Sequence, residues 1–291
     1  MQIQWFPGHM AKTRRELEES ITKVDLVAEL ADARIPDSSR NPVLDELVGN
    51  KPRILVLTRR DQADPQETER WLAYYRATGL YALAVDAKSG SGCQGFAPLA
   101  REALAEKIER WNARGMKGAH LKVMVVGIPN VGKSSFINRL SGRAAAKAED
   151  RPGVTRQKQW IRLSGGLDLL DTPGMLWPKL EEGRVGEHLA FTGAIRDDIL
   201  DLETLAARLL ALLAERAPAL VAERFGITDG NMSEAELLET AARRRGFLIK
   251  GGEIDGERTA RVLLDEYRGG KLGRITLEPA SAEPTPDVKG E

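Results

Sequence analysis

This sequence has no long hydrophobic run, a single cysteine and no net charge. No apolar run approaches the roughly 18 residues that a membrane-spanning helix needs, and the first residues, MQIQWFPGHMAKTRRELEES, lack the apolar core of a secretion signal. A single cysteine, Cys93, excludes an internal disulfide framework and favours a reducing compartment. Since 43 basic and 43 acidic residues cancel, the overall charge gives no argument for nucleic-acid binding. We expect a soluble cytoplasmic protein without a membrane partner.

The apolar segments that are present predict an α/β fold. Three of them, VDLVAELAD, RILVLTRRD and LYALAVDAK, end in polar residues and are separated by helix-like sequence such as PQETERWLAYYRATG. A long helical stretch, FAPLAREALAEKIERWNARG, precedes a fourth strand, LKVMVVG, and then a pair of strands ends in LDLLDTPG. This alternation is typical of a mostly parallel sheet with flanking helices.

The last third of the chain has a different pattern. From about Leu200, leucines recur at intervals of three and four, which predicts a small all-helical domain. The final stretch, EPASAEPTPDVKGE, is rich in proline, serine and charge, so it buries too little apolar surface to order itself. We expect a disordered tail there.

A phosphate-binding loop is the strongest motif. The segment GIPNVGKS at residues 127–134 follows a hydrophobic strand and opens a helix, as the phosphate-loop pattern requires. Its backbone N–H groups are expected to surround the β-phosphate, while Lys133 neutralises the β- and γ-phosphates and the Ser134 hydroxyl binds Mg²⁺. ATP and GTP both remain open at this step. The expected phosphate-binding residues are Asn130, Val131, Gly132, Lys133, Ser134, Ser135 and Gly174.

Two further segments fit the switch loops of a nucleotide hydrolase. Asp171 begins a D-T-P-G sequence at the end of a strand, where an aspartate is needed near Mg²⁺, in its second shell, and the N–H of Gly174 senses the γ-phosphate. The same sequence also makes a good turn without any ligand. Thr155 follows an Arg-Pro-Gly-Val turn and supplies the hydroxyl expected of a first switch, which contacts Mg²⁺ and serves catalysis.

The residues that favour guanine precede the phosphate loop. Asp61 closes the sequence Thr58-Arg59-Arg60-Asp61, in the position where GTPases carry Asn-Lys-x-Asp, and its carboxylate fits the N1–H and N2 amino edge of guanine. Arg59 can place a cation over the base, whereas Thr58 offers only a hydroxyl. Ala87 and Lys88 follow Asp86 in a loop similar to the Ser-Ala-Lys loop whose N–H meets guanine O6. Together these motifs favour GTP over ATP, in a circularly permuted order.

This motif order sets the expected domain organisation. Permutation lets the chain leave the sheet soon after the D-T-P-G switch and enter the helical domain, so the γ-phosphate can bias that domain. The predicted parts are an N-terminal arm at 1–20, a circularly permuted P-loop GTPase domain at 21–190, a helical domain at 191–275 and a tail at 276–291.

The chain resembles the ribosome biogenesis GTPase A family of circularly permuted GTPases over nearly its whole length. The resemblance rests on WFPGHM at 5–10, DARIP at 32–36, the permuted motif order, and GFLIKGGEID with ARVLLDEYRGGKLGRI near the end. It implies a GTPase that binds GTP and GDP, contacts rRNA and ribosomal proteins on a late precursor of the large ribosomal subunit, and is released on hydrolysis. We expect it to act as a monomer.

The resemblance also implies two roles at the phosphates. Met175 stands where Ras-like switches carry a water-orienting glutamine, and the family implies His9 as the catalytic group instead. A surface residue or an RNA contact is the alternative for His9. Asn130 resembles the asparagine that binds K⁺ in related GTPases, and the alternative is an ordinary loop-capping residue.

RNA contacts and catalysis remain open in the sequence. Basic clusters are candidate RNA contacts, although a charge run is commonly a solvated helix face. A GTP-dependent rRNA-binding scaffold with little catalysis is the alternative function, and an ATP-dependent small-molecule kinase is disfavoured by Asp61. The candidate RNA-contacting residues are Lys12, Arg14, Arg15, Arg243, Arg244, Arg245 and Lys271.

Overall fold

The computed structural model describes residues 7–116, 118–142, 158–176, 183–229 and 231–280 of the 291-residue chain, with side chains from residue 14 onward. The chain divides into two compact units. One comprises Trp5–Pro178 with Glu278–Glu291, and the other comprises Lys179–Leu277 with Met1–Gln4. Each unit is described by itself below.

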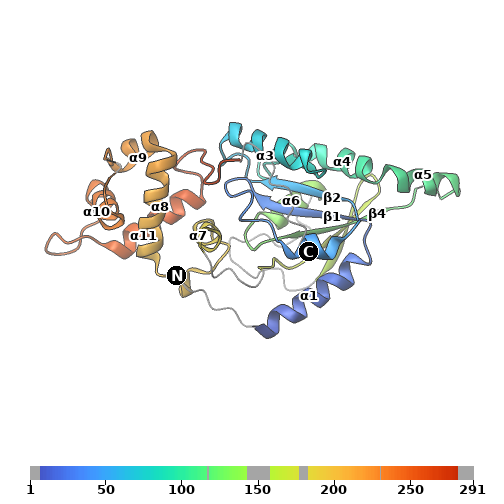
Figure 1. The fold of residues 1–291 in the computed structure, drawn as a ribbon, viewed down its shortest axis with the longest axis horizontal. Helices are drawn as coiled ribbons and strands as arrows, with labels where there is room; N and C mark the ends of the chain where they lie inside the picture. Colours follow the sequence, from blue (N-terminus) through green and yellow to red (C-terminus); the bar gives the residue numbers. More distant parts are fainter. Residues whose placement is uncertain (1–6, 117, 143–157, 177–182, 230, 281–291) are drawn as a thin grey trace, which may run out of the picture. The chain divides into compact units, whose positions relative to one another are not determined.

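The first unit is built on a six-stranded sheet (Figure 1). The strand order is β3-β2-β1-β4-β6-β5, and every neighbouring pair is parallel except β5 with β6. The mostly parallel α/β sheet that the apolar segments predicted is therefore confirmed. The strands are β1 (Leu26–Asp32), β2 (Arg53–Thr58), β3 (Tyr81–Ala84), β4 (Leu121–Gly127), β5 (Gln159–Leu163) and β6 (Leu167–Asp171).

Helices cover both faces of this sheet, which explains why every residue of β1 is buried. On one face, Leu17 and Ile21 of α1 (Pro7–Ile21) and residues of α2 (Val43–Val48) pack against β1, β4 and β6. On the other face, Trp71 and Tyr75 of α3 (Pro65–Ala77) pack against β2 and β3 (Figure 1). The Asp64 carboxylate caps α3 by accepting the N–H groups of its first turn.

The direction of α1 follows from a short connection. Only a few residues link Ile21 to Leu26, so α1 returns along the sheet face antiparallel to β1. Its last turn therefore lies near the amino ends of the parallel strands. Its first turn, which carries His9, points towards their carboxyl ends, where the nucleotide motifs lie.

The long helical stretch after β3 is two helices in the structure. α4 (Phe96–Ala103) and α5 (Ala105–Ala113) meet at Leu104, whose φ of −112° and ψ of 15° interrupt the helix. Phe96 packs edge to face on Phe136 of α6 (Lys133–Ser141), with ring centroids 5.2 Å apart. This contact fixes the phosphate-loop helix against α4.

The second unit is a helical bundle, and the helical character predicted from the leucine spacing is confirmed. Leucines of α8, α10 and α11 form its core, among them Leu209, Leu237 and Leu263. Beside them, Glu266 pairs with Arg224 and Arg245. The helices are α7 (Arg184–Phe191), α8 (Leu202–Arg216), α9 (Pro218–Phe225), α10 (Glu234–Arg245) and α11 (Gly256–Arg268).

The start of the predicted tail is packed rather than disordered. The Glu278 carboxylate accepts the backbone N–H of Asp37 at 2.8 Å, and the Trp71 indole donates to the Glu278 carbonyl at 2.8 Å. These polar contacts order residues whose composition alone predicts disorder; residues 281–291 lie outside the described part. Among the helices of the described ranges, none combines the length and apolar character that crossing a bilayer requires.

Candidate nucleotide-binding site

The sequence motifs meet at one edge of the sheet in the first unit. β1, β2, β3, β4 and β6 run parallel, so the loops after them lie at their common carboxyl edge. Ligands of open α/β sheets bind at this edge. The permuted order along the chain therefore leaves the spatial arrangement of a nucleotide site intact.

The phosphate loop joins β4, which ends at Gly127, to α6, which begins at Lys133. Gly132 has a φ of 96° and Asn130 a φ of 59°, a left-handed conformation that glycine adopts freely and asparagine tolerates. At Gly127, an added Cβ would lie 2.9 Å from the Leu30 carbonyl oxygen, so only glycine fits beside β1. The loop is thereby held in the turned path that directs N–H groups inward.

Lys133 forms a buried ion pair with Asp171. Its Nζ lies 2.8 Å from Asp171 Oδ1, and the two side chains are 7% and 0% exposed. Within the described residues, the second carboxylate oxygen, Oδ2, is buried without a hydrogen-bond partner. A buried carboxylate oxygen with no partner is costly, and it fits a site that also receives a cation or its bound water.

These residues fit Mg²⁺ held jointly with phosphates. In the described ranges, no group of three or more His, Cys, Asp or Glu side chains is arranged to hold a metal by itself. Mg²⁺ in such sites is bound by few protein groups and by substrate phosphates. Ser134 is half-buried in the first turn of α6, as is Ser135, and Asp171 completes the set. Ser134 and Asp171 would hold Mg²⁺, which would supply positive charge to neutralise the phosphates.

The D-T-P-G segment packs directly against the phosphate loop. A Cβ at Gly174 would lie 2.9 Å from the Pro129 Cα, and the Met175 N–H donates to the Gly127 carbonyl at 3.1 Å. The Met175 side chain packs against the apolar cluster that includes Leu17 of α1. A γ-phosphate that moves Gly174 would therefore act on a segment that contacts the phosphate loop and packs on the core cluster to which α1 contributes.

Thr58, which replaces the asparagine of the usual guanine motif, contacts the phosphate loop. Its hydroxyl donates to the Val131 carbonyl at 2.5 Å and lies 3.1 Å from the Ala31 carbonyl. The side chain is 1% exposed. Thr58 thus ties β1 and β2 to the phosphate loop, a role that its short side chain can fill without an amide.

Thr58→Val should lower both the free energy of unfolding and nucleotide affinity. Valine keeps the shape of threonine but leaves the buried Val131 carbonyl without its donor, which costs about 1–3 kcal/mol. Denaturant unfolding and a titration with fluorescent GTP measure the two effects. Thr58→Ser, which keeps the hydroxyl, is the matched control. Equal values for valine and serine would show that the hydrogen bond has no such role.

Arg59 also contacts the phosphate loop. Its Nη2 donates to the Asn130 carbonyl at 3.0 Å, and its Nε lies 3.6 Å from Asp32. Asp32 is fully buried and paired with Arg34 at 2.7 Å; burial raises its pKa, but the charges of Arg34 and Arg59 hold it below the ordinary value. Asp61, two residues after Arg59, is exposed at the same edge. Its carboxylate is therefore accessible to a base.

The Ala87-Lys88 loop is tied to the phosphate-loop helix. The Asp86 carboxylate accepts the N–H of Lys88 at 2.8 Å and that of Ser89 at 3.2 Å. Burial raises the pKa of Asp86, but these bonds and the Ser89 hydroxyl hold it below the ordinary value. From α6, Arg139 donates to the carbonyls of Ala87 and Lys88. The loop expected at guanine O6 is thus fixed to the helix that begins at the phosphates.

Several predicted site residues are not seen at the nucleotide-binding edge of the sheet. Thr155 lies outside the described residues, and for His9 and Lys12 the structure describes the backbone of α1 alone. Arg14 pairs with Glu18 and Glu46 in the first unit. Arg15 also lies on α1. In the second unit, Arg243 pairs with Glu239, and Arg245 pairs with Glu266. The other two predicted basic residues of that unit are Arg244 and Lys271.

Sequence reasoning left three site residues without a role. Asp32 and Arg34 were noticed as part of a family signature, and the polar ending of the β1 strand was the available signal. Arg139 carries no motif at all. Its role follows from its position on α6 facing the Ala87-Lys88 loop, which only the fold reveals.

Comparisons with known proteins agree with this geometry. Residues 122–228 match the family model described as 50S ribosome-binding GTPase. Ribosome biogenesis GTPase A of Priestia megaterium is 47% identical over 97% of this chain and 99% of its own length. Mitochondrial ribosome-associated GTPase 1 of Mus musculus is 32% identical over 94% of this chain and 90% of its own length.

The similarity extends to solved structures. GNP-bound YlqF from T. maritima superimposes with a TM-score of 0.65 at 27% identity, over 93% of this chain and 99% of that one. A GDP-bound YlqF structure gives a TM-score of 0.64, also at 27% identity, over 91% and 98%. The resemblance predicted from the motifs is confirmed: the chain is a GTP hydrolase that belongs to the ribosome biogenesis GTPase A family.

Proposed function

We propose that this GTPase binds a late precursor of the large ribosomal subunit and hydrolyses GTP there, promoting maturation and its own release. The names of its relatives support a ribosomal partner, since they include ribosome biogenesis and mitochondrial ribosome-associated GTPases. The proposal places this activity in the cytoplasm, with rRNA and ribosomal proteins as partners and the chain acting as a monomer.

The observation that carries the proposal is the contact between Gly174 and Pro129. The D-T-P-G segment, in which we expect Gly174 to sense the γ-phosphate, packs against the phosphate loop, and the chain leaves this segment for the helical unit a few residues later. We assign residues 191–275 as the part that contacts the ribosome. In this arrangement the presence of a γ-phosphate can alter how the helical unit is held.

A GTP-dependent rRNA-binding scaffold remains the second candidate, because Met175 replaces the water-orienting glutamine. Its side chain packs against an apolar cluster, so it takes no part at the phosphates. The intact pair of Lys133 with Asp171, and Ser134 at the start of α6, favour catalysis. The catalytic group then has to come from elsewhere, and we assign it to His9.

GTP turnover with and without purified large-subunit precursors tests the proposal. Strong stimulation by the precursor supports a GTPase whose hydrolysis is coupled to assembly. Mature large subunits and small subunits are the matched controls, and we expect weaker stimulation from both. No stimulation by any particle would favour the scaffold.

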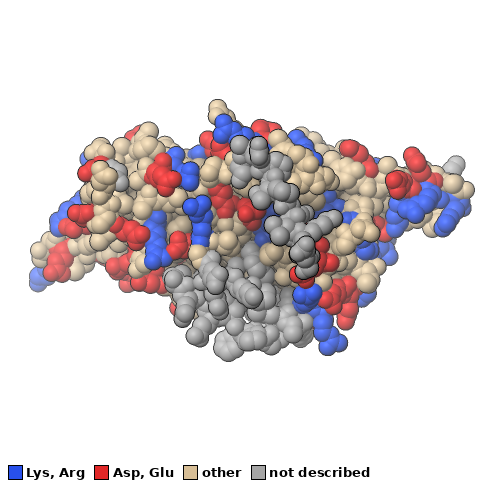
Figure 2. All heavy atoms as spheres, in the orientation of Figure 1, with Lys and Arg blue, Asp and Glu red and all other residues tan. Residues whose placement is uncertain are grey.

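RNA contact through the basic clusters is a further part of the proposal. Figure 2 shows Lys and Arg side chains interspersed with Asp and Glu on the face it presents, in keeping with zero net charge. Any contact with rRNA therefore depends on local groups such as Lys12, Arg14, Arg15 and the arginines at 243–245. A steep fall of particle affinity with salt would indicate phosphate contacts.

Asp61→Asn should change base preference. The carboxylate accepts the N1–H and the 2-amino group of guanine, whereas an asparagine amide can donate to the 2-oxo group of xanthine. We expect GTP affinity to fall by about 5- to 150-fold, as for loss of a bidentate base contact, and affinity for xanthosine triphosphate to rise. Titrations with both nucleotides measure this. Asp64→Asn, at the cap of the following helix, is the control, and the same result from both variants would contradict the assignment.

Potassium should accelerate hydrolysis if Asn130 binds a monovalent cation near the phosphates. One added electrostatic contact of about 1.4 kcal/mol in the transition state raises a rate about tenfold. Rates measured in KCl and NaCl at equal ionic strength, for the wild type and Asn130→Ala, provide the test. Equal wild-type rates in the two salts would leave Asn130 as a loop-capping residue.

A further inference from the structure

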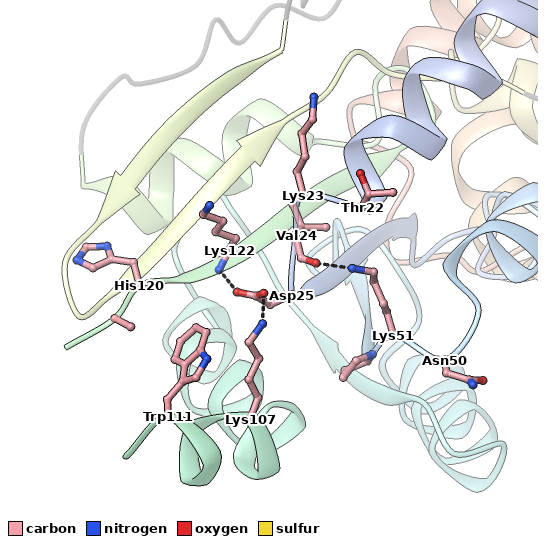
Figure 3. Close-up of a pocket in the computed structure, with 12 residues that line it drawn as sticks. Thr22, Lys23, Val24, Asp25, Asn50, Lys51, Lys107, Trp111, His120 and Lys122 are labelled. Atoms are coloured by element: carbon pink, nitrogen blue, oxygen red, sulfur yellow. Dashed lines mark hydrogen bonds and ion pairs between the residues drawn. The ribbon is translucent and has the colours of Figure 1, made fainter. Parts of the chain in front are cut away.

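A basic cavity lies at the edge of the sheet opposite to the nucleotide site (Figure 3). Its volume is about 530 Å³, and its walls come from the residues before β1, β2 and β4 and from α5. Because β1 spans the sheet at about 3.3 Å per residue, this amino edge is roughly 20 Å from the nucleotide loops. Substitutions in the cavity are therefore separated from the GTPase machinery.

The lining of this cavity is strongly cationic. It contains Lys23, Lys51, Lys107 and Lys122, with Asp25 as its single carboxylate. Asp25 is already engaged, because Lys107 pairs with one of its oxygens and the Lys122 N–H donates to the other at 2.8 Å (Figure 3). The excess of positive charge is thus left for a ligand to neutralise.

The lysine head groups differ in what they contact. Lys51 Nζ donates to the Val24 carbonyl, a neutral group, at 2.6 Å. Lys122 is exposed at the start of β4, and Lys23 makes no side-chain hydrogen bond to any described part of the chain. Lys23, Lys51 and Lys122 are accordingly the groups suited to bind an anion.

Two tryptophans stand beside these lysines. Lys107 Nζ lies 4.8 Å from the ring centroid of Trp111, and Lys122 Nζ lies 5.8 Å from that of Trp160. Trp160 is 48% exposed on the edge strand β5, where it pairs with Leu170 of β6. Its sheet face also carries Lys122, Asp168 and Arg162. A large aromatic ring left exposed next to cations is the combination found where single-stranded nucleic acid binds.

We propose that the cavity at the amino edge, together with the neighbouring Trp160 of β5, binds a single-stranded RNA segment. Bases stack on Trp160 and Trp111, and phosphates are bound by Lys23, Lys51 and Lys122. The proposal rests on the proposed ribosomal function in that it names the part of an RNA partner that the GTPase unit contacts. This proposed RNA-binding surface is different from the basic clusters of α1 and of the helical unit.

Single-stranded RNA fits this surface better than other polyanions. An acidic peptide would use the lysines but has few planar groups to cover the indole rings. Bases in RNA duplexes are already stacked, whereas loops and bulges offer free base faces next to phosphates. A cavity of about 530 Å³ admits one or two nucleotides rather than a helix.

Binding of fluorescent single-stranded oligoribonucleotides by the full chain, followed by anisotropy at several salt concentrations, tests the proposal. Trp160→Ala should weaken binding by about 5- to 150-fold, the loss of one stacked base, and Trp160→Phe should restore most of it. Lys23→Gln with Lys122→Gln should lower the slope of log affinity against log salt by about 0.7 for each lost phosphate contact. GTP affinity should be unchanged in the double lysine variant, because both lysines lie at the amino edge of the sheet.

The controls separate the possible outcomes. Arg70→Gln, an exposed charge removal on α3 away from the cavity, should leave both affinity and salt slope at the wild-type value. Wild-type RNA affinity in Trp160→Ala and in the double lysine variant would overturn the proposal, as would equal competition by polyglutamate and by RNA. Particle-stimulated GTP turnover of the wild type tests the ribosomal function separately.

Discussion

Lys133→Ala should weaken GTP binding by about 30- to 5,000-fold, the cost of removing one member of a buried charged contact. The ammonium group that we expect to neutralise the β- and γ-phosphates lies 2.8 Å from Asp171. Its loss also leaves the Asp171 carboxylate buried without a counter-charge. We therefore expect the free energy of unfolding, measured without nucleotide, to fall by about 3–5 kcal/mol.

A double variant separates these two effects. Lys133→Ala combined with Asp171→Ala removes the uncompensated carboxylate, so stability should recover while GTP affinity stays low. Denaturant unfolding gives the stability, and a titration with fluorescent GTP gives the affinity. Wild-type affinity in a folded Lys133→Ala protein would falsify the assignment of Lys133 to the phosphates. Recovery of affinity in the double variant would contradict it as well.

Local patterns were sufficient to predict the fold class and the phosphate loop. Buried runs such as LKVMVVG predict parallel strands because both faces of such a sheet are covered, and the phosphate loop carries its own signature of glycines, Lys133 and Ser134. The packed segment at residues 276–280 was predicted to be disordered, because its order depends on Glu278 contacting Asp37, far away along the chain. Composition contains no signal for such a contact.

The sequence predicted which residues belong to the candidate site, but it did not predict which groups their side chains contact. Spacing predicted Thr58 and Arg59 as base-recognition residues but gave no sign that the Thr58 hydroxyl and the Arg59 guanidinium bind carbonyls of the phosphate loop. The direction of a side chain is set by the neighbouring strand, which a single sequence does not specify. The ties made by Arg139 are likewise visible only once α6 is placed beside the Ala87-Lys88 loop.

The described loops at the carboxyl edge of the sheet do not supply a side chain that could orient the attacking water. Met175 packs against the apolar cluster to which Leu17 and Ile21 of α1 contribute, so the segment after Gly174 and α1 share one core cluster. Because α1 runs antiparallel to β1, its first turn is directed towards the carboxyl edge, where we expect the phosphates to bind. This arrangement supports His9 as the residue that orients or relays a proton from the attacking water.

His9→Ala should therefore lower the single-turnover rate of GTP hydrolysis on the ribosomal precursor by about 10²- to 10⁴-fold, the usual contribution of a general acid or base. GTP affinity should remain near the wild-type value, because the expected phosphate contacts of Lys133, Ser134 and the backbone N–H groups do not involve the imidazole. Quenched-flow measurement of phosphate release, with enzyme in excess over GTP, reports the chemical step.

His9→Gln serves as the matched variant, because a glutamine amide can orient water but does not exchange a proton with it near neutral pH. Partial activity in His9→Gln with little in His9→Ala would indicate that orientation of the water is the main contribution. Equal loss in both would indicate proton transfer. An unchanged rate in His9→Ala on the precursor would remove His9 from catalysis and favour a group supplied by the ribosomal particle itself, since the described loops around Asp171 and Gly174 offer no other side chain for the task.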